Sequence, residues 1–222
     1  MRYVIRGLEI RSENAAKPAG SASRWVLRWI RCLPHDLSGL DIGCGKLRYT
    51  IPLSKRIAKV TAVDSSVQLD RLQIVSGRLR SVRLYASESL RNVKIHSLED
   101  STWRRRRYQV VLCTNVLSAI PCTKTRQRLV RDAFSCLAPD GKLLITTQYR
   151  NSHFSGWKTD PKAIPYLDGF LVTGKRGTSF YGLLDAAALT SLCLRCGFRV
   201  AQSGHVKELA YVVACRPRLK AR

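Results

Sequence analysis

The sequence predicts an α/β domain built on a mostly parallel sheet, and three observations support this fold class. Two apolar runs, residues 40–42 and 60–64, stand at the separation that two parallel strands joined by a helix require. Residues 110–113 form a continuous apolar run, which is typical of a strand buried on both faces of a parallel sheet. Helical and strand periodicities alternate through most of the chain, so we expect one domain of this class.

The size and composition of the chain fit one globular domain. With 222 residues and 45% hydrophobic content, the chain can bury one sizeable core. No run approaches the roughly 18 uncharged apolar residues that span a bilayer, and residues 1–6 show no secretory signal. We therefore expect a soluble cytoplasmic protein with no membrane partner.

The eight cysteines are scattered, and the only Cys-x-x-Cys pair is Cys193 and Cys196. One such pair cannot supply the ligands of a structural zinc site. Together with Leu189 and Leu192, these cysteines follow the spacing of the buried face of a helix. We expect them to pack in the core, and we expect no metal site.

The chain is strongly basic, with 39 Lys and Arg against 15 Asp and Glu and a formal net charge of +24. Such a charge concentrates polyanions around a protein, so nucleic acid is a possible partner. The charges run along the whole chain without a recognition module, which is equally typical of a generally basic surface. Both interpretations stay open.

The chain starts with a lead-in that we expect to be irregular, because residues 1–20 mix charges with Pro18 and Gly20. Residues 21–32 have the periodicity of a helix, and Pro34 ends that segment. The apolar stripe of this helix consists of Trp25, Val26, Trp29 and Ile30. We treat residues 1–36 as an N-terminal lead-in and capping helix.

The strand at residues 40–42 leads into a glycine turn that carries the first candidate site. Gly43 and Gly45 allow a tight turn and a close approach of the backbone to a ligand. Asp64 ends the next strand, 19 residues after Gly45, where a carboxylate can accept hydrogen bonds from both hydroxyls of a ribose. The third glycine of a dinucleotide fingerprint would fall at Arg48, so the spacing indicates a nucleotide other than a dinucleotide.

The middle of the chain continues the alternation of helices and strands. A crossover helix starts near residues 49–51, because Pro52 is tolerated only in a first helical turn. The pattern of residues 65–90 predicts a helix followed by a second stretch that is rich in arginine, and we expect a break between the two near residues 76–77. Residues 93–96 form the third strand.

Arginines occupy all four positions from 104 to 107, just before the fourth strand at residues 108–114. This run can contact phosphates or form a solvated loop, and both interpretations stay open. We expect the loop to flank the ligand-binding edge of the sheet. Asn115 follows the fourth strand at its carboxyl end, where open α/β sheets hold their ligands.

The last third of the chain completes the sheet. A helix over residues 125–137 leads through a Pro-Asp-Gly turn into a strand at 142–148. Residues 149–182 are the least regular part and are rich in aromatic residues. A helix over 183–196 ends at Gly197, and two strands, residues 198–200 and 208–215, precede a basic tail.

Two motifs resemble those of class I methyltransferases that depend on S-adenosylmethionine (SAM). The first is Asp-x-Gly-x-Gly at residues 41–45, and the second is Leu-x-Pro-x-Gly at residues 137–141. The resemblance covers residues 37–215 and implies a doubly wound, mostly parallel, seven-stranded Rossmann-like sheet with SAM as the cofactor. This chain departs from the family at Leu47, where a third glycine is common.

The resemblance also implies roles for individual residues. One of two acids after the third strand would accept a hydrogen bond from the adenine amine, and a residue after the fourth strand would lie near the methyl-transfer site. The expected cofactor-binding residues are Asp41, Gly43, Gly45, Asp64, Glu99 or Asp100, and Asn115. No catalytic residue is assigned, because a sulfonium already activates the methyl group and leaves the protein mainly to position the reactants.

The predicted organisation is a lead-in and capping helix at 1–36, a SAM-binding methyltransferase domain at 37–215 and a basic tail at 216–222. Within the domain, residues 149–182 form an insertion on the acceptor side. The predicted function is methyl transfer to a small molecule or to a nucleic acid. The alternative is a nucleic-acid-binding protein that keeps the fold without turnover, and the oligomeric state stays open.

Overall fold

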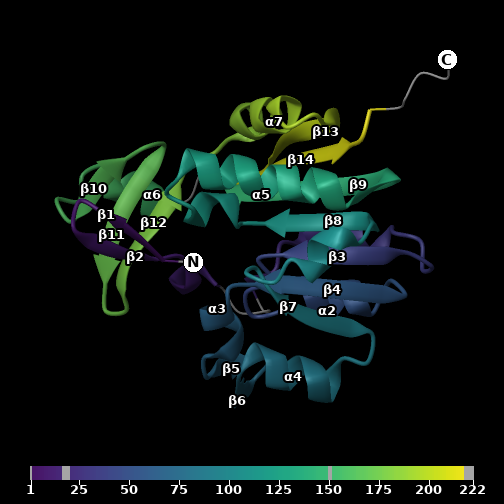
Figure 1. Ribbon diagram of the computed structural model, residues 1–222. Helices are drawn as coiled ribbons and strands as arrows, with labels where there is room; N and C mark the ends of the chain where they lie inside the picture. Colours follow the sequence, from purple (N-terminus) through teal and green to yellow (C-terminus); the bar gives the residue numbers. More distant parts are fainter. Residues whose placement is uncertain (1, 17–20, 150–151, 218–222) are drawn as a thin grey trace.

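The structure of the chain is a computed structural model that describes residues 2–16, 21–149 and 152–217. Its centre is a seven-stranded sheet with the strand order β13-β14-β9-β8-β3-β4-β7 (Figure 1). The strands are β3 (Ser38–Ile42), β4 (Lys59–Asp64), β7 (Val93–Ser97), β8 (Tyr108–Thr114), β9 (Leu137–Gln148), β13 (Arg199–Val206) and β14 (Leu209–Cys215).

The pairing in this sheet confirms the predicted doubly wound, mostly parallel arrangement. β3 pairs in parallel with β4 on one side and with β8 on the other, and β14 runs antiparallel to both β9 and β13. Every residue of β8 except Gln109 is buried, as expected for a parallel strand covered on both faces.

Helices cover both faces of the sheet. On one face, Leu129 and Val130 of α5 pack in the same cluster as Ile145 of β9. On the other face, Val26 and Ile30 of α1 pack against residues of β8 and β9. The α-helices are α1 (Arg24–Arg31), α2 (Thr50–Ser54), α3 (Ser66–Asp70), α4 (Val82–Ser89), α5 (Thr123–Cys136), α6 (Ser152–Trp157) and α7 (Ala186–Arg195). Among the described residues, no helix is long and apolar enough to cross a bilayer.

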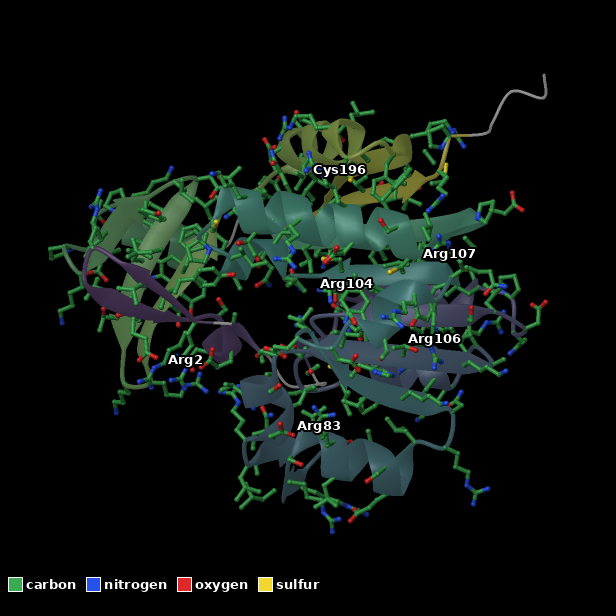
Figure 2. All side chains as sticks on the ribbon, in the orientation of Figure 1. Arg2, Arg83, Arg104, Arg106, Arg107 and Cys196 are labelled. Carbon is green, nitrogen blue, oxygen red and sulfur yellow. The ribbon has the colours of Figure 1, made fainter. Side chains whose placement is uncertain are left out.

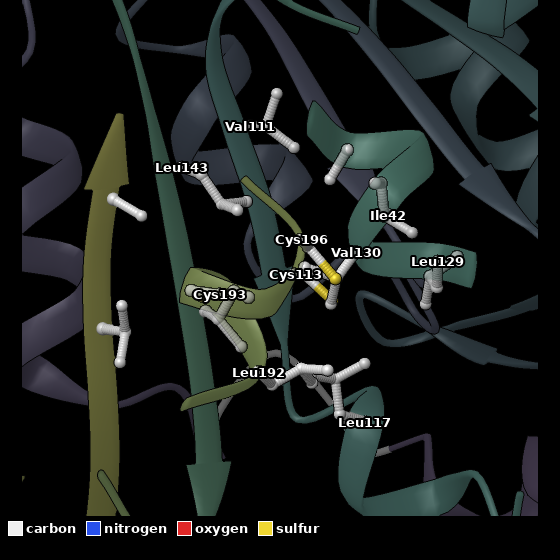
Figure 3. Packing of buried hydrophobic residues seen from close by; sticks show 14 of the residues in the cluster. Ile42, Val111, Cys113, Leu117, Leu129, Val130, Leu143, Leu192, Cys193 and Cys196 are labelled. Carbon is white, nitrogen blue, oxygen red and sulfur yellow. The ribbon is translucent and has the colours of Figure 1, made fainter. Parts of the chain in front are cut away.

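The face covered by α5 and α7 contains the cysteine pair. Cys193 and Cys196 are buried in the main core cluster (Figure 3), which confirms the prediction that they pack in the core. Burial raises the pKa of the Cys193 thiol to about 12, so this thiol stays protonated and apolar in character at neutral pH. Gly197 follows α7 with φ +89° and ends this helix as predicted.

A second sheet of five strands joins two segments far apart in the sequence, with the order β1-β2-β12-β11-β10. These strands are β1 (Arg2–Ile5), β2 (Leu8–Arg11), β10 (Ala163–Tyr166), β11 (Gly169–Gly174) and β12 (Gly177–Gly182). The predictions of an irregular lead-in and of an irregular 149–182 segment are therefore wrong. Ile10 is fully buried against Leu171 and Phe180, so the N-terminal segment and residues 163–182 share one small core.

A partly buried ion pair links the second sheet to the main domain. Arg126, on the first turns of α5, donates from Nη1 and Nη2 to the two carboxylate oxygens of Asp168 at 2.6 and 2.9 Å. Its Nε donates to the carbonyl oxygen of Ile120 at 2.8 Å. Arg126 is 5% exposed, so this two-pronged contact fixes the turn before β11 at the carboxyl end of the parallel strands.

The arginine-rich stretch after Asp64 is only partly helical. The predicted break near residues 76–77 is the turn of a small hairpin, formed by β5 (Gln73–Val75) and β6 (Arg78–Arg80). Both residues of that turn have positive φ values, as a two-residue hairpin turn requires. The helix that follows, α4, begins at Val82 with Ser81 as its N-cap.

Candidate cofactor site

The glycine turn after β3 lies at the carboxyl ends of β3, β4 and β8. Gly43 and Gly45 have φ values of +71° and +56°, which side chains strongly disfavour. A Cβ on Gly43 would lie 2.3 Å from Cγ2 of Val116. The amide of Gly43 donates to the carbonyl of Val63 at 2.7 Å, so the turn is pinned to the neighbouring strand. Its backbone can therefore approach a ligand closely.

Leu47 occupies the position at which the family often has a third glycine, and its φ is +62°. The left-handed conformation costs a residue with a side chain roughly 1–2 kcal/mol. Leu47 is fully buried and packs with Cys44, Ala62 and Leu69. Burial of the leucine side chain offsets the strain, so the turn keeps the shape that a glycine would give it.

Asp41 ends in the cavity beside this turn and is 1% exposed. Its Oδ2 accepts a hydrogen bond from Oγ1 of Thr50 at 2.6 Å, while Oδ1 has no partner among the described residues. Burial, with a smaller contribution from the negative charge of Asp64, raises the pKa of the Asp41 carboxyl to about 7, against the opposing hydrogen bond from Thr50. The free oxygen offers an acceptor to a ligand donor or cation.

Asp64 is the last residue of β4 and lines the same cavity as Asp41. Its Oδ2 accepts from the amide of Gly45 at 2.8 Å, and its Oδ1 accepts from the amide of Ser65 at 2.7 Å. Burial raises the pKa of Asp64, and the two backbone amides oppose that shift. The carboxylate therefore joins the glycine turn to the start of α3 and lines the cavity with lone pairs still available.

The two candidate adenine acids have different surroundings, and neither lines the cavity that holds Asp41 and Asp64. Asp100 is engaged by Nδ1 of His96 at 2.9 Å and by Oγ1 of Thr102 at 2.8 Å. These contacts hold the pKa of Asp100 well below its usual range. Glu99 accepts from Oγ of Ser66 at 3.1 Å, at the start of α3. The choice between the two acids stays a prediction.

Asn115 follows β8 in a left-handed conformation with φ +59°, which asparagine tolerates better than most residues. Its amide donates to the carbonyl of Thr146 at 2.7 Å. Together with Arg48, it lines three cavities, of about 80, 240 and 470 Å³. The cavities therefore adjoin one another at these two residues.

Each cavity has a distinct lining among the described residues. The first contains the glycine turn and the acids Asp41 and Asp64. The second is largely aromatic and is lined by Phe154, Trp157, Phe180 and Tyr181. The third is basic and polar and includes Ser23, Arg24, Tyr49, Lys207 and Glu208.

Sequence reasoning missed part of the first cavity. Residues 12–16, which we call the strap, cross the carboxyl edge of the sheet and supply four lining residues, Ser12, Glu13, Ala15 and Ala16. The strap contains the short helix η1 (Ser12–Ala15). The sequence carries no local signal for this role, because the strap reaches the site through the pairing of β2 with β12 and other contacts to remote segments.

The arginine run at residues 104–107 does not gather at the site. Arg104 pairs with Asp132 at 3.0 Å and stacks over the Trp103 ring at 4.2 Å. Arg106 and Arg107 are exposed and precede the first residue of β8. Because parallel strands start at the edge away from their carboxyl ends, these two side chains lie on the far side of the molecule from the strap (Figure 2). The expectation that the loop flanks the ligand edge is therefore wrong for Arg106 and Arg107, whereas Arg104 donates to the carbonyl oxygens of Leu98, which lines the first cavity, and of Asp100.

The fold defines a Rossmann-like α/β protein with a cavity at the carboxyl ends of its parallel strands. Residues 13–203 match the family model described as a methyltransferase domain. The chain belongs to this family, and it is a class I SAM-dependent methyltransferase, as its two motifs predicted.

Curated relatives match the chain over different lengths. The uncharacterized protein YmfD of Escherichia coli is 35% identical over 212 residues, which cover 96% of this chain and 95% of that protein. A ubiquinone biosynthesis O-methyltransferase of Coxiella burnetii is 28% identical over 112 residues. That match covers 50% of this chain and less than half, 44%, of the relative.

Solved structures share the fold at low sequence identity. The DhpI complex with S-adenosylhomocysteine (SAH) has a TM-score of 0.61 at 16% identity, over 86% of this chain and 83% of that one. The PH0226 protein of Pyrococcus horikoshii has a TM-score of 0.65 at 14% identity, over 89% and 93%.

The site has donors and acceptors that fit SAM, which is the cofactor of this family. SAM carries an ammonium, a sulfonium and ribose hydroxyls, and the cavity offers the unpartnered Oδ1 of Asp41 and the carboxylate of Asp64. SAM also carries a carboxylate, and Arg48 lines the cavity. The described residues contain no group of His, Cys, Asp and Glu that could hold a metal ion.

Proposed function

We propose that this enzyme methylates a small molecule with a planar ring, held in the aromatic cavity beside the cofactor. The observation that carries the proposal is this cavity of about 240 Å³, which shares Arg48 and Asn115 with the cofactor cavity. Trp157 lies against Tyr181 with ring centroids 4.5 Å apart, and against Phe154 at 5.0 Å. Such rings favour an aromatic or otherwise flat ligand.

Each part of the cofactor has a proposed partner. Asp64 accepts hydrogen bonds from the ribose, and the free oxygen of Asp41 faces the ammonium group. Arg48 pairs with the carboxylate, and Gly43 and Gly45 let the backbone lie against the ligand. Either Glu99 or Asp100 accepts from the adenine amine, and Asn115 lies nearest to the methyl group.

The chain contributes position rather than acid–base chemistry. SAM supplies a methyl group on an activated sulfonium, which needs in-line placement and little else. Asn115 stands between the cofactor cavity and the aromatic cavity, so a ligand on its aromatic side faces the methyl group. The aromatic side chains exclude water from that approach.

The aromatic cavity favours a small acceptor over a nucleic acid. Its inner wall is buried, since Phe154 and Phe180 are 7% and 1% exposed. The exposed Arg106 and Arg107 lie at the far edge of the sheet, where phosphates bound to them would be remote from the methyl group. Arg106 and Arg107 then have no role in acceptor binding.

Methyl-labelled SAM offered with separated cell fractions tests the proposal. We expect label to enter a low-molecular-weight fraction, and we expect Trp157→Ala to reduce that transfer while SAH binding by calorimetry stays unchanged. Label in RNA or DNA, with Trp157→Ala as active as wild type, would contradict a small acceptor. No transfer to any fraction, with intact SAH binding, would contradict turnover itself.

A further inference from the structure

The strap brings to the cofactor cavity an acid that lies outside the sequence motifs. Glu13 lines this cavity, and its side chain is 3% exposed. Its Oε1 pairs with Nε of Arg2 at 3.3 Å, while Oε2 has no hydrogen-bond partner among the described residues. A buried carboxylate oxygen without a donor destabilises a protein, so a ligand donor at this position would satisfy it.

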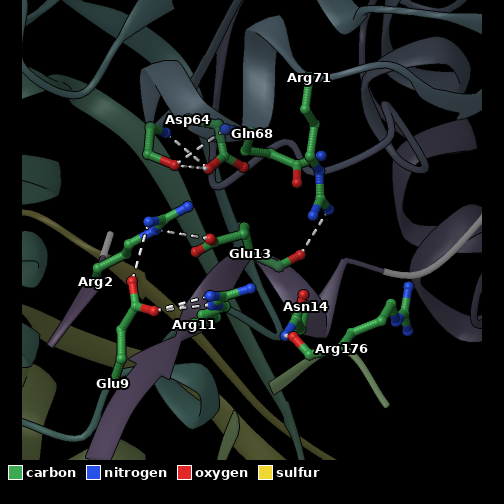
Figure 4. Close-up of polar contacts among 10 residues, drawn as sticks. Arg2, Glu9, Arg11, Glu13, Asn14, Asp64, Gln68, Arg71 and Arg176 are labelled. Carbon is green, nitrogen blue, oxygen red and sulfur yellow. Dashed lines mark hydrogen bonds and ion pairs between the residues drawn. The ribbon is translucent and has the colours of Figure 1, made fainter. Parts of the chain in front are cut away.

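The strap is held in place on several sides (Figure 4). Oγ of Ser12 donates to the carbonyl of Ala119 at 2.9 Å, at the turn beyond β8. Nη2 of Arg71 donates to the carbonyl of Glu13 at 2.8 Å, and Nδ2 of Asn14 donates to the carbonyl of Arg176 at 2.9 Å. Glu13 is therefore positioned before any ligand binds.

Its neighbours place Glu13 on the Asp64 side of the cavity. Arg71 follows α3, which begins two residues after Asp64. Burial lowers the pKa of Arg71, and the negative charges of both Glu13 and Asp64 oppose that shift, so both carboxylates lie near the same guanidinium. Gln68, on α3, also lines this side and leaves its Oε1 unpartnered among the described residues. Acceptors thus gather here around the position assigned to the ribose.

We propose that Glu13 accepts a hydrogen bond from a ribose hydroxyl of the cofactor, so that the strap and Asp64 hold the ribose from two separate segments of the chain. This inference rests on the cofactor assignment of the proposed function and is independent of the acceptor. The second sheet then contributes to cofactor binding, because β2 leads directly into the strap.

Calorimetry with SAH and with its 2′,3′-dideoxy analogue tests the assignment. In wild-type protein we expect SAH to bind more tightly than the analogue. Glu13→Gln keeps the shape of the side chain and removes its charge, and we expect it to weaken SAH about tenfold without changing the affinity of the analogue. Glu9→Gln is the matched control, since Glu9 lies on β2 just before the strap, pairs with the same Arg2 and does not line the cavity, and it should leave both affinities unchanged.

Two results would overturn the proposal. Equal losses for SAH and the dideoxy analogue would show that Glu13 acts on another part of the ligand or on the fold, and unchanged SAH affinity would remove Glu13 from the site. Glu13→Asp, which withdraws the carboxylate by one methylene, should reproduce the loss and serves if Glu13→Gln does not fold. The labelled-methyl assay is read separately, so failure of this inference leaves the proposed transfer standing.

Discussion

Leu47 shows how one residue can keep a backbone conformation against its own preference. At φ +62° an alanine retains the left-handed strain and loses most of the buried side chain, whereas a glycine loses the side chain but relieves the strain. We expect both Leu47→Ala and Leu47→Gly to destabilise the protein, by about 2–4 kcal/mol. Leu47→Gly should be the more stable of the two in urea unfolding, and the reverse order would show that the strain is negligible.

Asp41 makes the stability of the ligand-free protein depend on pH. Its pKa is about 7 in the folded protein and near the ordinary aspartate value of 3.8 in the unfolded chain. At any pH between these two pKa values, the Asp41 carboxyl is protonated more often in the folded state than in the unfolded state. The free energy of unfolding therefore falls as pH rises from about 4 to about 7. We expect Asp41→Asn to gain stability relative to wild type between pH 5 and pH 8 in urea unfolding. A constant difference at both pH values would contradict the raised pKa.

The two adenine candidates can be separated by charge-removing substitutions. The carboxylate of Asp100 is already engaged by His96 and Thr102, whereas that of Glu99 reaches Ser66 on α3, beside Asp64. We therefore expect Glu99→Gln to weaken SAH binding by roughly 1 kcal/mol and Asp100→Asn to leave it unchanged, as measured by calorimetry. Comparable small effects from both would mean that the adenine lies elsewhere.

At the scale of elements, the contact between α5 and the second sheet depends on Arg126. Removing its side chain leaves Asp168 without its two-pronged partner and the Ile120 carbonyl without a donor. Because the Asp168 side chain is 37% exposed, water recovers part of the loss, and we expect Arg126→Ala to cost about 1–3 kcal/mol. Thermal unfolding measures the loss. Arg128→Ala, exposed on the same helix, is the control and should be neutral.

At the scale of the whole molecule, the charge of +24 is distributed rather than focused. We expect a single-stranded oligonucleotide to bind at low salt and to dissociate near about 0.15 M salt. Replacing Arg106 and Arg107 with Gln should reduce the salt slope by the same amount as replacing Arg28 and Arg31, which are exposed on α1. Binding that survives 0.15 M salt and is lost only with Arg106 and Arg107 would indicate a dedicated site.

The sequence predicted the parts of the fold whose signals are local. The glycine turn, the continuous apolar strand β8 and the stop of α7 at Gly197 each follow from residues within a few positions of one another. The second sheet could not be predicted, because it depends on Ile10 pairing with Thr178. At the site, Gly43 and Asp64 could be predicted because they belong to a motif with a recognisable spacing. Glu13 could not, because its position depends on the pairing of β2 with the remote strand β12.

The pairing of β2 with β12 also constrains the order in which the protein can fold. Ile10 and Thr178, which pair in this sheet, are far apart in the sequence. Bringing them together lowers the conformational entropy of the chain before their contacts form, so we expect the five-stranded sheet to form late. During synthesis the β1–β2 hairpin and the strap are made before residues 163–182, which supply the other three strands of the sheet. The cofactor cavity is therefore complete only after most of the chain has been made, and SAM cannot stabilise earlier intermediates through the full site.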